Sequence, residues 1–148
     1  MVAFAAVAIL GLFPVALDTA RESQRETHAT LIARSLLADL RSTMGTTPGS
    51  SPPSAAAMVG SGTVPVLIPG GEAFRLFDEI GEPLTTGTAP TTRADFQKPV
   101  PAAVFGARLA SGTTSTQGLY WVTVTVETPM QATGTLRKTY PFTTMVAP

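Results

Sequence analysis

The segment VAFAAVAILGLFPVALDTARES, residues 2–23, decides the fold of this chain. It carries no charged side chain before Asp18 and then becomes abruptly polar. As a helix, the uncharged run would span roughly 25 Å, against a hydrocarbon core of about 30 Å. No basic residue precedes the run and residues 15–18 make a poor cleavage site, while the lack of a polar stripe argues against a buried core helix. The run therefore predicts a membrane span over residues 1–17, with a signal peptide and a core helix as alternatives.

The helix is expected to continue past the apolar run. Residues 18–44 contain neither glycine nor proline and are rich in helix formers, and Gly45 supplies a C-terminal stop. Pro14 is expected to kink the apolar part. One helix over residues 1–44 is predicted, whose rear carries an apolar stripe with the spacing of a buried face. The stripe consists of Ala29, Ile32 or Ala33, Leu36, Leu37, Leu40 and Met44.

A connector and a β domain follow the helix. Residues 45–73 are rich in proline, glycine and serine and are expected to be mostly irregular, with a short edge strand at 64–68. Residues 74–148 are expected to form an antiparallel sheet. Its strands are predicted at 74–77, 104–109, 119–127 and 136–145, with an irregular loop at 111–118.

The clearest strand is LYWVTVTVE, residues 119–127. Its alternation places Val122, Val124 and Val126 on one face, together with Tyr120. Because the stripe of the helix is the only large apolar partner available, the valine face is expected to pack on it. Pro141 is expected to place the last strand at an edge or a bulge. The predicted fold class is α+β, a long N-terminal helix with a membrane-embedded first half, packed on a small antiparallel sheet.

This order of elements resembles the type IV pilin and pseudopilin superfamily. The segments MVAFAAVAILGLFPVALDTARES and LIARSLLADLR look like the region just downstream of the prepilin processing site. More narrowly, LGLFPVALDTARES, FRLFDEIGEPL and YWVTVTVETP are similar to the group called Verru_Chthon cassette protein B. The resemblance implies a structural subunit of a type IV pilus or type II secretion-like assembly that polymerises through its apolar helix. The residues expected to pack in that assembly are Phe4, Ile9, Leu10, Leu12, Phe13, Pro14 and Leu17.

The resemblance also implies partners and a location. The partners are other pilin-like subunits, the lipid bilayer and the assembly machinery, and the location is the bacterial inner membrane, single-pass, with the C-terminal domain on the periplasmic or extracellular side. Family members begin with a basic leader, a glycine at the cut site and a glutamate as the fifth mature residue, and none of these precedes Met1. Arg21 and Arg25 follow the apolar run, which by the positive-inside rule would place the C-terminal domain in the cytoplasm. A basic leader encoded upstream would remove both conflicts.

The amino-acid composition argues against nucleic-acid binding and against chemistry that needs cysteine. Lysine plus arginine number 10 and aspartate plus glutamate number 10, so no basic surface is available to hold nucleic acid. The chain has no cysteine, which excludes disulfides and thiolate chemistry. His28 is expected to be a surface helix residue, and no nucleophile–base pair or phosphate-binding loop is present, so no enzyme activity and no cofactor are predicted. The alternative function is a single-span, membrane-anchored small β module that binds a ligand or acts as an adhesin without polymerising.

Two groups of charged residues are weaker candidates for function, one as a calcium site and one as a set of charge pairs. Asp78, Glu79 and Glu82 surround Gly81, and their oxygens could hold Ca²⁺, although a solvated turn is the preferred interpretation. The first polar turns of the helix offer charge pairs three and four residues apart, which could stabilise the helix or pair between subunits. These residues are Asp18, Arg21, Glu22, Arg25 and Glu26.

Overall fold

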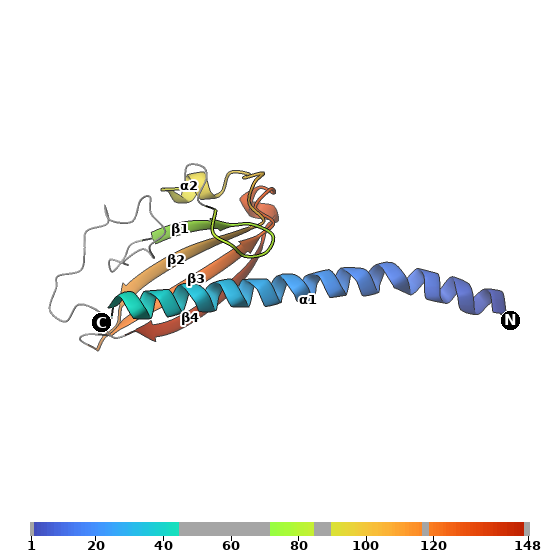
Figure 1. Ribbon diagram of the computed structural model, residues 1–148, viewed down its shortest axis with the longest axis horizontal. Coiled ribbons are helices and arrows are strands. Elements are labelled where there is room, and N and C mark those ends of the chain that lie inside the picture. The colour runs from blue at the N-terminus through green and yellow to red at the C-terminus, as the bar shows by residue number, and fades with distance from the viewer. Residues whose placement is uncertain (1, 45–71, 85–89, 117–118, 147–148) are drawn as a thin grey trace.

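In the computed structural model, one long helix lies lengthwise on a four-stranded sheet and extends far beyond it (Figure 1). The structure describes all residues except 1, 45–71, 85–89, 117–118 and 147–148, and it describes only the backbone of residues 2–13, 42–44 and 113. Helix α1 spans Val2–Met44, so the predicted continuous helix is confirmed. The backbone remains helical through Pro14.

The sheet is an antiparallel meander in the order β1-β2-β3-β4. Strands β1 (Glu72–Phe77), β2 (Phe105–Thr113), β3 (Tyr120–Thr128) and β4 (Lys138–Val146) correspond to the four predicted strands. Strand β4 lies at one edge and contains Pro141, as expected, because a central strand would lack a hydrogen bond at that position. The α+β class is therefore confirmed.

Strand β2 differs most from its prediction, because it extends to Thr113 instead of ending at Leu109. Its last residues were expected to form a loop, yet Ser111 is buried and lies opposite Val122 of β3. Alanine, serine and glycine have weak strand propensity, and the pairing with β3 overrides it here. The proposed strand at 64–68 lies outside the described residues.

The main core lies between α1 and the sheet. Ala29, Ile32, Ala33, Leu36 and Leu40 of the helix are all at most 3% exposed, so these residues of the predicted stripe form the buried face. Leu37 is half-buried, and the side chain of Met44 lies outside what the structure describes. The facing residues of the sheet include the three valines of β3, each fully buried. This is the predicted helix-on-sheet packing, and the apolar area that it removes from water is the main source of stability. Those valines are Val122, Val124 and Val126.

A second, smaller cluster covers part of the opposite face of the sheet. Phe74 of β1 packs its ring 5.0 Å from that of Phe96, which ends the short helix α2 (Arg93–Phe96), and Met130 completes the contact. Gly106 of β2 allows this approach, because a Cβ atom there would lie 2.6 Å from the Met130 sulfur. A 3₁₀ turn, η2 (Gly134–Leu136), follows. The sequence did not predict α2 or this second cluster.

Candidate assembly surface on helix α1

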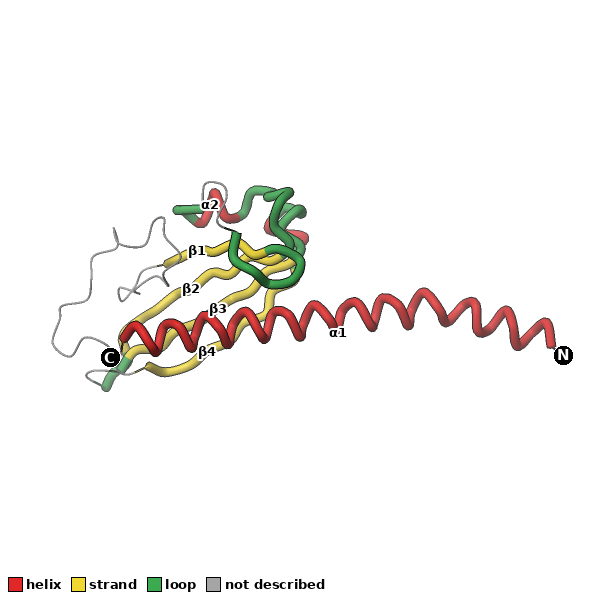
Figure 2. The backbone as a smooth tube through the Cα atoms, in the orientation of Figure 1, coloured by secondary structure: helices red, strands yellow, loops and turns green. Residues whose placement is uncertain are grey.

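The front half of α1 projects away from the sheet into open space (Figure 2). Every residue from Pro14 to Ala20 is exposed, with Val15 at 62% and Leu17 at 44%. Large apolar side chains with this much exposure on a regular helix mark a surface that is available to a partner. Pro14 and Leu17 of the predicted packing residues therefore lie on the projecting half. The others belong to the same segment, where the structure describes the backbone alone: Phe4, Ile9, Leu10, Leu12 and Phe13.

The expected membrane span over residues 1–17 is wrong. Within the helices that the structure describes, none has both the length and the apolar character that crossing a membrane requires. The helix that contains the uncharged run continues through Asp18 and the polar residues that follow it. The single-pass inner-membrane location, with the C-terminal domain on the periplasmic or extracellular side, is corrected accordingly.

A polar clamp, formed by Glu22, Lys138 and Tyr140, fixes α1 at the place where it leaves the sheet. One carboxylate oxygen of Glu22 accepts a hydrogen bond from the Tyr140 hydroxyl at 2.7 Å and pairs with the Lys138 ammonium at 2.7 Å. Lys138 and Tyr140 both belong to edge strand β4. The clamp therefore joins the helix to edge strand β4 just behind the projecting half.

The charges of the clamp shift two pKa values. The hydrogen bonds from Lys138 and Tyr140 hold the pKa of Glu22 below its ordinary value of 4.5. Desolvation, then the hydrogen bond and the charge of Glu22, raise the pKa of Tyr140 to about 12. Both shifts stabilise the same state, in which the ionised Glu22 carboxylate accepts a hydrogen bond from the neutral Tyr140 phenol.

The predicted charge pairs along the helix do not form within the described residues. Glu22 pairs with strand β4 instead of with a neighbour on α1. The other charged residues of this stretch, Asp18, Arg21, Arg25 and Glu26, take part in none of the ion pairs between described residues. His28 is half-buried and not fully on the surface, because its ring lies 6.0 Å from that of Phe105.

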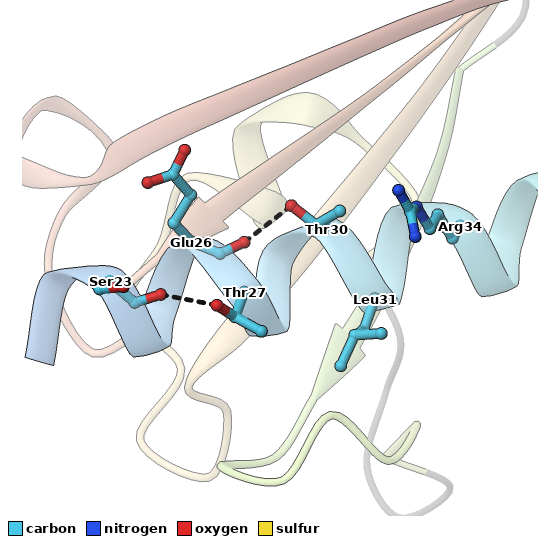
Figure 3. Close-up of a pocket in the computed structure, with 6 residues that line it drawn as sticks. All are labelled: Ser23, Glu26, Thr27, Thr30, Leu31 and Arg34. Carbon is cyan, nitrogen blue, oxygen red and sulfur yellow. Dashed lines mark hydrogen bonds between the residues drawn. The ribbon is translucent and has the colours of Figure 1, made fainter.

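A shallow hollow of about 330 Å³ lies on the solvent side of α1, behind the clamp (Figure 3). Two rows of side chains border it, each with a spacing of four residues. The Thr27 hydroxyl donates to the Ser23 carbonyl and the Thr30 hydroxyl to the Glu26 carbonyl, both at 2.9 Å. The two threonine hydroxyls are thus already occupied within the helix. The two rows are together called the outer groove here. One row consists of Ser23, Thr27 and Leu31, and the other of Glu26, Thr30 and Arg34.

The calcium candidates lie in a tight turn after β1. One carboxylate oxygen of Asp78 accepts the backbone N–H groups of Ile80 and Glu82 at 3.0 and 2.9 Å, and Gly81 supplies the positive φ of 89° that the turn requires. That oxygen is therefore used in shaping the turn. Among the residues with described positions, no three acidic or histidine side chains gather closely enough to hold a metal ion, so Asp78, Glu79 and Glu82 do not form such a group.

Arg137 is a buried charge that no pattern in the sequence indicated. Its side chain is fully buried and donates to the carbonyls of Phe96, Lys98 and Ala132 at 2.6, 2.7 and 3.0 Å. It also lies 3.4 Å from a Glu127 carboxylate oxygen. The guanidinium joins the α2 region to the loop after β3, and its role here is structural.

No protein-family model, no curated protein and no solved structure matches this chain. The function of this chain is therefore inferred from the geometry of α1 and from the chemistry of its exposed side chains.

Proposed function

We propose that this chain is a pilin-like structural subunit that assembles with related subunits through the projecting front half of α1. In the assembly, front halves pack side by side and the sheet domains are carried outside the helical bundle. The proposal places the chain in the class of pseudopilins or minor pilins of a type IV pilus or type II secretion-like assembly. Its work is mechanical, and it needs no cofactor.

The observation that carries the proposal is the exposure of Val15 and Leu17 on a helix that extends beyond its own sheet. The segment before Asp18 contains no charged residue, so nothing in its sequence opposes burial against other apolar helices. Burial stabilises an assembly by about 25 cal/mol per Å² of apolar surface. Identical helices present many such side chains at once, so a bundle accumulates this gain over the whole front half.

The attachment of α1 to the sheet supports the same proposal. The rear of the helix is held by the core, and the clamp of Glu22, Lys138 and Tyr140 restrains the exit of the front half. A front half with a fixed direction loses less conformational freedom when it binds its neighbours than a loosely tethered one would. Repeated copies would then present their sheet domains in a uniform way.

Sedimentation velocity on the full chain tests the proposal. We expect the wild-type chain to form large assemblies and Leu17→Arg to shift it toward small species, because a buried arginine without a partner is costly. Leu136→Arg is the matched control, since Leu136 is also an exposed leucine, at 75%, but lies next to β4 and not on the helix. Assemblies that survive Leu17→Arg, or that Leu136→Arg disrupts equally, would contradict the proposed surface. A wild-type chain that stays monomeric and binds a small ligand would favour a non-polymerising binding module.

A further inference from the structure

We infer that the outer groove of α1 is a second self-association surface, on which two copies of this chain pair with their helices antiparallel. This surface lies behind the clamp and is separate from the projecting front half. It is made of the two rows of side chains shown in Figure 3. The partner is therefore a second copy that presents the same groove.

The shape of the groove fits an α-helix. Rows of side chains spaced by four residues are the ridges that interdigitate when two helices cross at about −50°, the commonest packing class in globular proteins. Thr27 and Thr30 direct their hydroxyls back to the helix carbonyls, so docking leaves these two hydroxyl donors satisfied. Leu31 is 57% exposed and supplies an apolar side chain for the contact.

The charges of the groove select the occupant and its direction. Glu26 and Arg34 are exposed, and neither forms an ion pair with any residue that the structure describes. They lie four residues on either side of Thr30, about 6 Å along the axis in each direction. When two copies cross at Thr30 with antiparallel helices, each Glu26 meets the Arg34 of the other copy. A parallel two-fold pair would bring like charges together, which is unfavourable.

The groove residues are largely open to a second copy. Ala29, Ile32 and Leu36 face the sheet, and the outer groove runs along a flank of α1, where Thr30 is half-buried and the other five residues are exposed (Figure 3). Two copies would form a layered dimer, with sheet, helix, helix and sheet in order. The same patch on both copies makes a closed two-fold contact, which stops at two subunits. The front halves then point in opposite directions and stay available for the proposed assembly.

Disulfide trapping tests the inference cleanly, because the full chain contains no cysteine. In the antiparallel dimer, Thr30 lies at the two-fold axis, so Thr30→Cys is expected to form a covalent dimer under mild oxidation. Gln131→Cys, at an exposed loop position, is the matched control and is expected to give background levels. Equal dimer yields from the two variants would overturn the inference.

Charge reversal in the Thr30→Cys background tests the direction of the helices. We expect Glu26→Arg or Arg34→Glu alone to reduce the yield of covalent dimer about tenfold, and the two together to restore it, because the pairing is then re-formed with the signs exchanged. Circular dichroism on each variant verifies folding. A double variant that stays as weak as the single variants would overturn the inference.

The same assay separates this inference from the proposed function. In a chain that also carries Leu17→Arg, large assemblies are expected to disappear while Thr30→Cys still gives the covalent dimer. Loss of the covalent dimer together with the assemblies would show that the groove is no independent contact and would overturn the inference. If wild-type chain forms no large assemblies but Thr30→Cys dimerises, the proposed function fails and the groove contact stands.

Discussion

Replacing Leu36 by alanine tests the packing of α1 on the sheet. Leu36 is 1% exposed and belongs to the main core, so its removal loses apolar burial and leaves a cavity. Leucine-to-alanine changes at such positions reduce the free energy of unfolding by about 2–5 kcal/mol. For a chain of 148 residues, a loss of about 3 kcal/mol lowers the Tm by roughly 6–12 °C.

The matched control is Leu136→Ala, because Leu136 lies outside α1 and outside both proposed association surfaces. Leu136 is 75% exposed, so the same chemical change is expected to alter the free energy of unfolding by less than about 0.5 kcal/mol. Urea denaturation followed by circular dichroism measures both variants. All samples need the same protein concentration, because association makes the apparent stability concentration-dependent. Equal losses for Leu36→Ala and Leu136→Ala would refute the assignment of the buried face.

Three further predictions concern the clamp and the buried arginine. Folding lowers the pKa of Glu22, so the stability that this residue adds is present above about pH 4.5 and is lost as the pH falls through the lowered pKa. Glu22→Gln should therefore reduce the loss of stability at acid pH in a plot of the free energy of unfolding against pH. Because the pKa of Tyr140 is raised to about 12, its contribution is complete below pH 10 and is lost between pH 10 and about 12, and Tyr140→Phe should remove that decline in the same titration. Arg137→Met should lower the free energy of unfolding by about 3–5 kcal/mol in urea denaturation, whereas Arg93→Met, at an exposed position, should change it little; equal effects would contradict the structural role of Arg137.

Periodicity alone was enough to predict the main elements. The spacing of Ile32, Leu36 and Leu40 gave the buried face of α1, and the alternation of Val122 and Val124 gave the buried face of β3. Both patterns repeat over several turns or residue pairs, so neighbouring positions support one another. A single proline indicated an edge or a bulge for β4, because proline has no backbone N–H to donate to a neighbouring strand, and the structure shows the edge.

Features that depend on single residues or on distant partners could not be predicted. Phe96 is one aromatic residue in a polar segment, and only the register of β1 and β2 shows which face it covers. Glu22 and Tyr140 are 118 positions apart in the sequence, so no local sequence pattern predicts their contact in the clamp. Arg137 stands beside Lys138 in the sequence, and only the fold buries one and exposes the other.

The candidate surface was predicted in part. The apolar composition of the front half indicated packing against other helices, and the exposure of Val15 and Leu17 agrees with an available surface. The membrane span was wrong, because none of the helices that the structure describes combines the length and the apolar character needed to cross a membrane. The outer groove was not predicted, because Ser23, Thr27 and Thr30 are residue types that occur on any polar helix face. Only the structure shows that they border a common hollow.

Intermolecular distance at Val15 tests the central claim most directly. A spin label on Val15→Cys is the only thiol adduct in this cysteine-free chain, so pulsed electron paramagnetic resonance reports distances between copies alone. Helices that pack side by side have axes 8–10 Å apart, so labels on adjacent front halves should lie within roughly 25 Å of each other. A defined distribution in that range is the predicted result, and a featureless decay from isolated chains would contradict assembly through the front of α1.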